Sequence, residues 1–307
     1  MIKKSRKNGD TSQSKTTEFI VKEPAGLLDF LLESLSNRSR NSVKSILSRG
    51  QVSVNGQAVT KHNHQLEPGQ QVSIQWGKGP EKVELTGLKI LHEDDDIIVI
   101  EKESGLLTIA SSKEKEMTAY RQLMAHVRSK NPKNRIFIVH RLDRDTSGVM
   151  MFAKNKNVQQ LLQNSWRESI LERTYVALVE GKVKKEKDTI ISWLKETKTL
   201  LMYSSKKPND GQKAVTHYKM IQSDRNFSLL EVKLETGRKN QIRVHMKDIG
   251  HPIVGDKKYG SRNNVIGRLG LHARILAFKH PITGETLRFE AKIPKQFLRP
   301  FNENKKK

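Results

Sequence analysis

Hydrophobic residues in the first quarter of the chain change from helical spacing to strand-like alternation. Leucine and phenylalanine recur at helical spacing from Leu27 to Leu35, and a second short helix is predicted over residues 40–48. Valine then alternates with polar residues, the tight-turn pair Asn55-Gly56 interrupts this run, and alternation resumes over residues 72–76. The pattern predicts a small helix-helix-strand module over residues 21–77.

The rest of the chain is dominated by short apolar runs of strand length. An aperiodic stretch rich in glycine, lysine and proline, residues 78–87, is predicted as a linker. Helical spacing occurs only at residues 118–129 and 158–169, which is too few helices for every strand pair to have a helical crossover. We therefore expect an α+β fold over residues 88–302, with a mixed, largely antiparallel sheet and flanking helices. Its predicted strands are 97–100, 136–139, 149–152, 175–179, 215–221 and 229–234.

Both ends of the chain are basic and poor in apolar residues. Residues 1–20 contain five Lys and Arg against two acids, so they cannot repay the entropy of ordering. We predict a flexible basic tail there and a second one at residues 303–307. Direct RNA contact and a mere effect on solubility are equally open for the first tail.

The charge balance indicates a polyanionic partner. The formal net charge is +24 and the pI is near 10.1, with nucleic acid as the commonest partner of such chains. A membrane partner would need a basic amphipathic helix or a lipidation signal, and a DNA-binding regulator would need a recognition helix and usually a dimer seam; none is evident. The sequence predicts a monomeric RNA-binding protein without a membrane or DNA partner.

Cysteine usage and targeting signals bear on the compartment. The chain has no cysteine, which excludes disulfides and thiolate metal sites and is compatible with a reducing cytosol. Its apolar runs are too short to span a bilayer, and the first residues lack the apolar centre of a secretory signal. We expect a cytoplasmic protein.

Two polar segments carry the candidate chemistry. His140 to Gly148 is a charged loop between two apolar strands, a place where rigid scaffolds usually carry function. In the second segment, the Gly237 turn is predicted to open a short helix on which Arg238, Gln241 and His245 project together. Neither spacing identifies a reaction by itself.

Together these segments resemble the RluA-type family of pseudouridine synthases, whose motif reads His-Arg-Leu-Asp, two residues, then Thr-Ser-Gly. The motif is complete here at residues 140–148, and the resemblance covers about residues 88–298. It implies an isomerase that converts uridine to pseudouridine in structured RNA. That reaction involves no redox change, so we expect no cofactor and no metal. Further matching stretches are 90–102, Gly105-Leu106, 173–175 with Gly181, 214–218, 271–273 and 280–281.

The resemblance also implies roles for individual residues. Asp143 is the expected catalytic carboxylate, and attack on ribose C1′ and removal of the C2′ proton both remain open. A carboxylate that stays ionised in a pocket needs a cationic partner, for which Arg243 is the first choice and Arg238 the alternative. Tyr175 is expected to stack on the extruded uracil with its hydroxyl near C5. Arg141 is expected to fill the gap left by the flipped nucleotide or, alternatively, to contact a phosphate.

Other residues that suggest chemistry are assigned structural roles. His140 and His245 have no evident part in this reaction, and we expect them to be hydrogen-bonded within the scaffold. The successive acids at residues 94–96 precede a strand and are expected to form a solvated turn rather than a metal site.

Three positions depart from the usual family pattern. Lys102-Glu103-Ser104 replaces a stretch in which the family often has a rigid proline turn. Asn240 stands where the family usually has histidine, and Arg173 stands where lysine precedes the motif tyrosine by two. Neither the aspartate nor the tyrosine of the motifs is affected, so we expect these changes to influence the choice of RNA.

The first module resembles the α-L RNA-binding domain through residues 28–31, Ser39-Arg40 and 50–56. Such a domain beside this catalytic domain resembles the arrangement in ribosomal RNA modifiers. It implies large-subunit ribosomal RNA as the first substrate and transfer RNA as the second. The alternative is a catalytically inert RNA-binding or ribosome-assembly protein. The residues expected to contact phosphates on a basic face of the module are Arg38, Arg40, Lys44 and Arg49.

Overall fold

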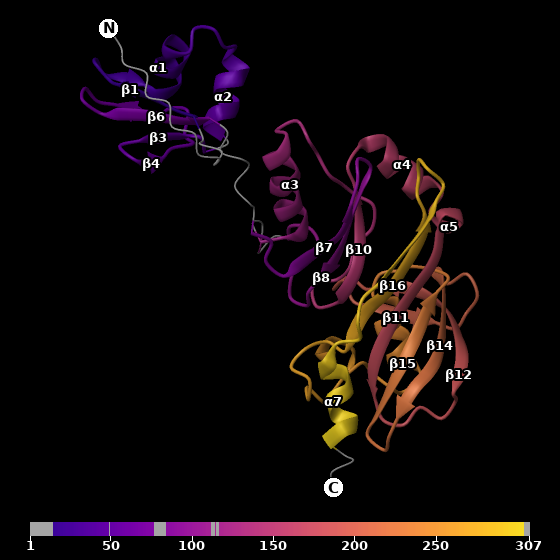
Figure 1. The fold of residues 1–307 in the computed structure, drawn as a ribbon. Helices are drawn as coiled ribbons and strands as arrows, with labels where there is room; N and C mark the ends of the chain where they lie inside the picture. The colour runs from indigo at the N-terminus through magenta and orange to yellow at the C-terminus, as the bar shows by residue number, and fades with distance from the viewer. Residues whose placement is uncertain (1–14, 49, 77–83, 112–113, 115–116, 304–307) are drawn as a thin grey trace, which may run out of the picture. The chain divides into compact units, whose positions relative to one another are not determined.

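The computed structural model describes residues 15–48, 50–76, 84–111, 114 and 117–303 (Figure 1). Residue contacts divide the chain into two compact units. The first comprises residues 1–83 together with 126–133, and the second comprises residues 84–125 and 134–307. The division after residue 83 falls inside the predicted linker, residues 78–87. The names given to the domains remain predictions.

The first unit contains both predicted helices and the predicted turn. Asn55 and Gly56 have φ angles of 50° and 82°, as a type I′ hairpin turn requires. One face of the sheet and both helices enclose an apolar core in which Leu27, Val43 and Ile74 are buried. The sheet order is β1-β6-β3-β4, and a short pair, β2 with β5, lies apart from it. The bounds are β1 Lys15–Ile20, β2 Ala25–Gly26, α1 Leu27–Ser34, α2 Arg40–Ser48, β3 Val52–Val54, β4 Gln57–Ala58, β5 Gln65–Leu66 and β6 Gln71–Trp76.

The predicted basic tail extends too far into the chain. Residues 15–20 form strand β1, which pairs antiparallel with β6 and places Phe19 opposite Val72. Phe19 packs against the core and meets the ring of Phe30 edge-on at 6.3 Å. The apolar area of Phe19 and the buried Val21 offsets the ordering cost that basic composition alone suggested. The tail prediction is therefore wrong for residues 15–20, and residues 1–14 lie outside the described part.

The second unit is built on one large mixed sheet, as predicted. Eleven strands take the order β13-β12-β14-β15-β11-β16-β10-β8-β7, with β17 beside β16 and β9 beside β10 (Figure 1). Among the described strand pairs, only β10 with β16 is parallel. Its strands are β7 Leu88–Glu93, β8 Ile97–Lys102, β9 Phe137–Ile138, β10 Ser147–Ala153, β11 Ile170–Glu180, β12 Lys187–Glu196, β13 Met202–Ser205, β14 Gln212–Ser223, β15 Phe227–Leu234, β16 Leu271–Lys279 and β17 Thr286–Glu290. By this division helix α3 Ala119–Lys130 has residues 119–125 in the second unit and 126–130 in the first. The other helices of the second unit are α4 Lys156–Asn164, α5 Trp166–Ser169, α6 Gln241–Asp248, the 3-10 turn η1 Lys257–Tyr259 and α7 Lys295–Glu303.

Strand β11 shows how the sheet carries two cores. Side chains alternate along a strand, so Val176 and Leu178 face one side and Ala177 and Val179 the other. The first pair packs in a cluster with α7, and the second pair packs in a cluster with α6. The central strand β10 is buried along its whole length. The loop before β10 and the turn before α6 therefore extend from rigid elements.

Two predicted helices begin or end elsewhere. The predicted helix 158–169 is interrupted at Ser165, whose hydroxyl donates to the carbonyl of Leu161, so that α4 and α5 are separate. The helix predicted from Gly237 begins only at Gln241, because Asn240 has a left-handed backbone. Strand β12 was not predicted, since its charged and apolar residues alternate weakly next to the edge strand β13.

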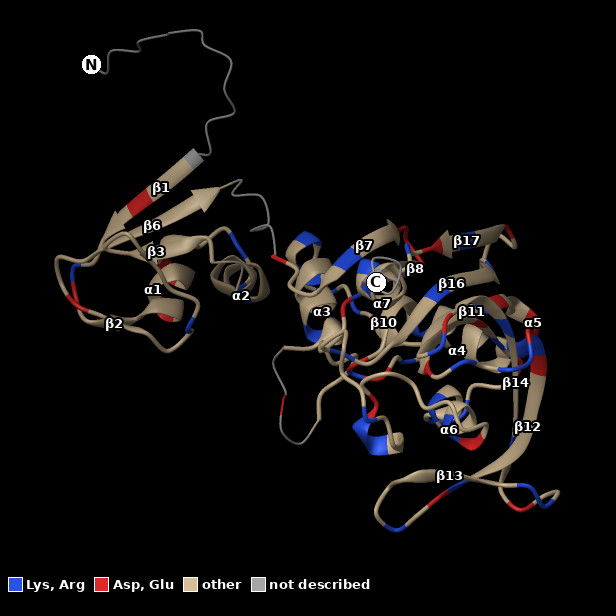
Figure 2. Ribbon diagram, turned by 90° about the horizontal axis from the view of Figure 1, so that it is seen from below, with Lys and Arg blue, Asp and Glu red and all other residues tan. Residues whose placement is uncertain are grey.

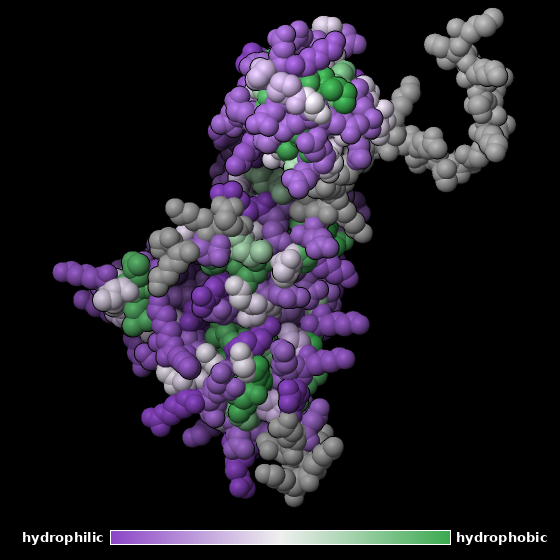
Figure 3. Space-filling view, turned by 90° about the vertical axis from the view of Figure 1, so that its left-hand side faces the viewer, coloured by the Kyte–Doolittle hydropathy of each residue, from purple (hydrophilic) through white to green (hydrophobic). Residues whose placement is uncertain are grey.

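The face drawn in Figure 3 is mainly hydrophilic. Figure 2 shows Lys and Arg in both units, and Figure 3 shows hydrophobic residues only in small separate groups on the face that it draws. No helix within the described ranges is long and apolar enough to cross a membrane.

Candidate active site

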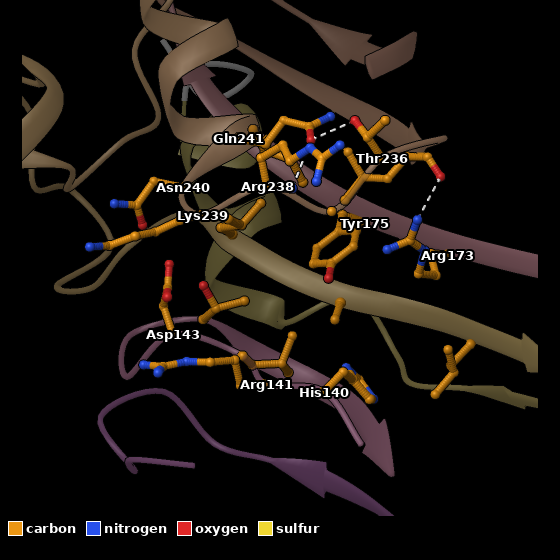
Figure 4. Close-up of a pocket in the computed structure, with 18 of the residues that line it drawn as sticks. His140, Arg141, Asp143, Arg173, Tyr175, Thr236, Arg238, Lys239, Asn240 and Gln241 are labelled. Atoms are coloured by element: carbon orange, nitrogen blue, oxygen red, sulfur yellow. Dashed lines mark hydrogen bonds between the residues drawn. The ribbon is translucent and has the colours of Figure 1, made fainter. Parts of the chain in front are cut away.

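The candidate site is a cavity of about 730 Å³ in the second unit. Five segments of the chain line it: the loop 139–149, residues 163–167 of α4 and α5, strand β11, residues 234–243 and strand β16 (Figure 4). The predicted residues Arg141, Asp143, Tyr175, Arg238 and Arg243 all lie on its wall. Cavities of this size hold compact ligands such as a nucleoside. The fold thus brings together five residues from three separate segments of the chain.

The loop that carries Asp143 is fixed where it enters β10. Gly148 has φ 115°, and a Cβ atom there would lie 2.0 Å from the carbonyl oxygen of Ala273 on β16. Only glycine permits this close crossing of the two strands. The buried Leu142 and the bond from the Thr108 hydroxyl to its carbonyl, 2.8 Å, anchor the residue before Asp143.

The end of β8 and the residues after it hold the middle of this loop. The fully buried Lys102 ammonium donates to the carbonyl oxygens of Glu103, Leu106 and Arg144 at 2.9, 2.7 and 3.0 Å. Burial lowers the pKa of Lys102 to about 8, although the charge of Asp145 opposes this shift. In place of a proline turn, the hydroxyl of Ser104 donates to the carbonyl of Asp145 at 2.7 Å. The departure at residues 102–104 therefore leaves the loop well anchored.

Asp143 faces Arg243 across the cavity. The Nη1 atom of Arg243 lies 3.8 Å from Oδ2 of Asp143. The Asp143 side chain is 36% exposed and that of Arg243 is 15% exposed. Among the described residues, no direct hydrogen bond reaches the Asp143 carboxylate. Asp143 is thus a carboxylate beside a fixed cation with its oxygens open to the cavity.

A second carboxylate, which the sequence did not reveal as functional, holds Arg243 from behind. Asp256 is fully buried and accepts hydrogen bonds from Nε and Nη2 of Arg243, both 2.7 Å long. The guanidinium also lies 4.9 Å from the ring centre of Tyr259. Burial disfavours the Arg243 charge, but the hydrogen bonds and charges of Asp256 and Asp143 outweigh burial and raise its pKa. The sequence signal that could have pointed to Asp256 was a single acid after the apolar run 252–254.

Asn240 links this buried group to the start of α6. Its φ of 54° is left-handed, a conformation that asparagine tolerates better than most residues. Its Oδ1 accepts from Nη1 of Arg243 at 3.1 Å, and its Nδ2 donates to the hydroxyl of Tyr259 at 3.1 Å. The hydroxyl of Tyr259 also accepts from the backbone N–H of Met202 at 3.2 Å. Asn240 therefore orients Arg243 at the position where the resemblance led us to expect histidine.

Tyr175 reaches the cavity from β11. Its ring is half-buried, and Figure 4 shows its hydroxyl pointing into the cavity on the side of Arg141 and His140. Burial raises the pKa of Tyr175, the charge of Arg173 opposes the shift, and the charge of Asp143 adds to it. The phenol is therefore neutral at pH 7.

Arg238 is held away from Asp143. Its Nε donates to the carbonyl of Lys213 at 3.1 Å, and its backbone N–H donates to Oε1 of Gln241 at 3.0 Å. Gln241 is buried but lines the cavity with Arg238, whereas His245 lies in the core and does not line it, so the prediction that all three project together is wrong for His245. The reason is that Gln241 binds Val215 and Thr216 and so anchors α6 on β14, where the His245 ring also bonds to Thr216. Arg141 is exposed at the opposite wall.

Both histidines expected to be structural are hydrogen-bonded within the scaffold. His140 Nε2 accepts from the backbone N–H of Met151 at 3.2 Å. The ring nitrogens of His245 lie 2.8 Å from the hydroxyls of Ser192 and Thr216. Burial lowers the pKa of each histidine to about 4, with the charge of Arg173 adding to the shift at His140. Both rings are neutral at pH 7.

The acids predicted to form a solvated turn are partly used as hydrogen-bond acceptors. Oδ1 of Asp94 accepts from the backbone N–H groups of Asp96 and Ile97, both at 2.8 Å. Its Oδ2 lies 2.7 Å from His92 Nε2 and 3.3 Å from His280 Nε2. Asp94, Asp96 and His280 offer ligand atoms within 4.8 Å of one another. The contacts of Asp94 are those of a residue that closes a turn, which accounts for the cluster.

The predicted basic residues of the first unit are exposed where the structure describes them. Arg38, Arg40 and Lys44 are exposed, and the guanidinium of Arg38 lies 4.5 Å from the ring centre of Trp76. Arg49 lies outside the described residues.

Comparisons with known proteins identify the family of the chain. Residues 96–248 match the family described as RNA pseudouridylate synthase. The chain is 38% identical over 273 residues to "Uncharacterized RNA pseudouridine synthase YlyB" of Bacillus subtilis, covering 86% of this chain and 89% of that one. It is 34% identical over 281 residues to "Ribosomal large subunit pseudouridine synthase D" of Vibrio cholerae, covering 85% and 86%.

Solved structures show a similar fold. Human RNA Pseudouridylate Synthase Domain Containing 1 superposes with a TM-score of 0.54 at 26% identity, covering 69% of this chain and 85% of that one. Human RNA Pseudouridylate Synthase Domain Containing 4 superposes with a TM-score of 0.57 at 24% identity, covering 69% and 92%.

Proposed function

The chain belongs to the RNA pseudouridine synthase family, and from this premise we propose that it converts uridine to pseudouridine in large-subunit ribosomal RNA. The enzyme class follows from the family, and the Vibrio relative, 34% identical, acts by its name on the large ribosomal subunit. The net charge of +24 suits a large RNA. The observation that carries the catalytic proposal is Asp143 beside Arg243 at 3.8 Å in a cavity that Tyr175 also lines.

The reaction defines what the site must supply. The bond between ribose C1′ and uracil N1 breaks, the base turns, and C1′ joins C5. The proton on C5 leaves and N1 gains a proton, so the composition of the RNA is unchanged. No electrons are gained or lost. The site therefore needs a carboxylate, a proton acceptor near C5 and room for an extruded base.

Asp143 is our proposed catalytic carboxylate. It would either attack C1′ and form a covalent adduct or remove the C2′ proton to give a glycal-like intermediate. Both routes require an ionised carboxylate with a free oxygen, and the open position of Asp143 beside the fixed Arg243 cation meets this requirement. Arg243 rather than Arg238 is the proposed partner, because Arg238 is bound to the Lys213 carbonyl.

Tyr175 and Arg141 are the proposed contacts of the extruded uridine. The ring of Tyr175 offers a stacking face, and its hydroxyl lies in the cavity where C5 would be placed. Because the phenol is neutral at pH 7, it must release its own proton to solvent as it accepts the one from C5, and N1 takes up a proton from solvent, so that the protons balance. Arg141 is exposed at the cavity wall and is proposed to occupy the space left in the RNA stack, which lowers the cost of flipping.

The first unit is proposed to add affinity. Arg38, Arg40 and Lys44 are exposed and would contact phosphates, which contributes binding energy without reading base sequence. Arg49, which lies outside the described residues, is proposed to act with them.

Pseudouridine mapping in cells tests the proposal. Total RNA from cells lacking this protein is compared with RNA from cells complemented with the intact protein or with Asp143→Asn, using a chemical label that stops reverse transcription. We expect one or a few sites in large-subunit ribosomal RNA to vanish and only the intact protein to restore them. Loss of a transfer RNA site instead would replace the proposed substrate. Restoration by Asp143→Asn would remove Asp143 from the mechanism.

A further inference from the structure

The hairpin between β12 and β13 presents an exposed leucine in a strained backbone conformation. Leu200 has φ 60°, and its side chain is 62% exposed. The backbone N–H of Leu200 donates to the carbonyl of Thr197 at 2.9 Å, and that of Thr197 donates to the carbonyl of Leu201 at 2.8 Å. These bonds define a three-residue loop whose last position is left-handed and is normally glycine. Leucine at this position therefore departs from the usual preference for glycine.

Other positions with a positive φ angle carry residues that tolerate this conformation better than leucine does. The remaining non-glycine residues with positive φ in the described chain are asparagines, at positions 55, 209 and 240, which tolerate this conformation. The neighbouring Leu201 already anchors the hairpin, since it packs against the buried cluster that contains Met202 and Tyr259. Leu200 is not needed for that packing and points to solvent. Strain retained without a packing benefit is typical of functional positions.

The location of the hairpin connects Leu200 to the active site. Strand β13 lies beside α6 (Figure 2). Glu196 at the base of the hairpin forms an ion pair with Lys239, which lines the cavity. The ammonium of Lys258 donates to the carbonyl of Leu200 at 3.3 Å. Lys198, within the loop itself, is exposed. The exposed Leu200 thus has Lys198 two residues before it and the Lys258 ammonium on its backbone carbonyl. The base of its hairpin is ion-paired to Lys239 of the cavity wall.

This combination fits a single strand of RNA better than a protein or a membrane. Base faces are apolar and phosphates are anionic, so a strand passing the hairpin would meet leucine and ammonium groups together. One leucine offers too little apolar area to hold a membrane or a protein partner.

We propose that Leu200 is an RNA-contact residue that packs against an unstacked base in the strand flanking the target uridine. Lys198 and Lys258 neutralise the adjacent phosphates. The contact supports the open conformation of the strand, because a base held against leucine does not return to its stack. This inference rests on the proposed function, since it concerns how the same RNA is held.

The first test uses Leu200→Gly, which removes the side chain and relieves the backbone strain. We expect the melting temperature to stay the same or rise, KM for unmodified large-subunit ribosomal RNA transcribed in vitro to rise roughly fivefold, and kcat to be unchanged. The matched control is Ile282→Ala, because Ile282 is 59% exposed and does not line the cavity. An unchanged KM in Leu200→Gly, or the same rise in Ile282→Ala, would overturn the inference.

A second test measures the contact without relying on activity. Leu200→p-benzoyl-phenylalanine and Ile282→p-benzoyl-phenylalanine are irradiated with the same transcript, and the crosslinked nucleotides are mapped. We expect the probe at position 200, and not the probe at 282, to crosslink to RNA within a few nucleotides of the modified uridine. Crosslinking of position 200 to a second copy of the chain, or to no RNA, contradicts the inference. Failure of the intact enzyme to form pseudouridine would contradict the proposed function instead.

Discussion

Two pairs of residues, each an aspartate and a tyrosine, lie on the two sides of Arg243. The pairs differ in how far their polar groups are hydrogen-bonded. On the buried side, Asp256 accepts two hydrogen bonds of 2.7 Å from the guanidinium, and the Tyr259 hydroxyl accepts from Asn240 and Met202. On the cavity side, Asp143 lies 3.8 Å from the same guanidinium, and Tyr175 points into the cavity. Hydrogen bonds saturate the first pair, whereas both groups of the second remain open.

The two aspartates therefore differ in role: Asp256 fixes the Arg243 cation, whereas Asp143 keeps its oxygens available to the substrate. A buried carboxylate is tolerated only when its hydrogen bonds are satisfied, so Asp256 is committed to Arg243 and has no oxygen free for substrate. Because Asp256 and Asn240 fix the guanidinium, Arg243 supplies a cation to Asp143 without occupying its oxygens. The matched residues of the two pairs therefore provide matched controls for one another.

The largest effect is expected from Asp143→Asn. We expect single-turnover pseudouridine formation to fall on the order of 10⁴-fold, because the amide can neither attack C1′ nor remove a proton. The melting temperature should change little, since no direct hydrogen bond to a described residue is lost. A fall in melting temperature as large as that of Asp256→Asn would show that the two carboxylates are not held differently.

Tyr175→Phe should give the next largest effect. The ring that stacks on uracil remains and only the hydroxyl is lost, so we expect kcat to fall about 10³-fold with KM nearly unchanged. Tyr259→Phe is the matched control and should lower the melting temperature more than it lowers kcat, because its hydroxyl is bonded to Asn240 and Met202. Equal kcat values for the two variants would contradict the proposed role of Tyr175.

Asp256→Asn should combine a moderate loss of rate with a loss of stability. Neutralising one partner of a buried ion pair leaves the other unpaired, and we expect the free energy of unfolding to fall by about 3 kcal/mol. Displacement of Arg243 should lower kcat about 100-fold with little change in RNA affinity. Chemical denaturation and single-turnover kinetics measure the two quantities. A variant with full stability and full kcat would show that Asp256 does not position Arg243.

The smallest effect on activity is expected at His245, which acts on stability through pH. Its pKa falls to about 4 on burial from an ordinary 6.5, so the unfolded state binds more protons between these values. Its contribution, about 3 kcal/mol, is therefore fully present above pH 6.5 and is lost as pH falls towards 4. His245→Gln should reduce the slope of the unfolding free energy across that window by this one contribution, while that of His140 remains. The exposed His62→Gln should not reduce the slope. Equal slopes in both variants would contradict this assignment.

The sequence predicted the elements of the fold well where periodicity was strong. Both short helices of the first unit and the Asn55-Gly56 turn are found as predicted, because local spacing and turn chemistry determine them. Strand β1 was missed, since basic composition concealed the two apolar residues that anchor it. Strand β12 was missed because it lies near the sheet edge, where alternation is weak.

The site residues could be predicted from the sequence only where they belong to a recognised motif. The structure places Asp143, Tyr175 and Arg243 around one cavity, as the motif residues suggested, and their roles remain proposals. Asp256 was not found, because its partner Arg243 is 13 residues earlier and only the folded turn after α6 brings them together. The strain at Leu200 depends on a backbone angle that residue identity does not reveal.

Primer-extension mapping of pseudouridine in unmodified large-subunit ribosomal RNA, incubated with the purified protein, tests the central claim most directly. RNA affinity of the intact protein and of Asp143→Asn is measured in parallel. The account predicts complete conversion at one or a few uridines by the intact protein and none by Asp143→Asn, although both bind the RNA equally well. Conversion by the variant, or an intact protein that binds this RNA and converts no uridine, would contradict it.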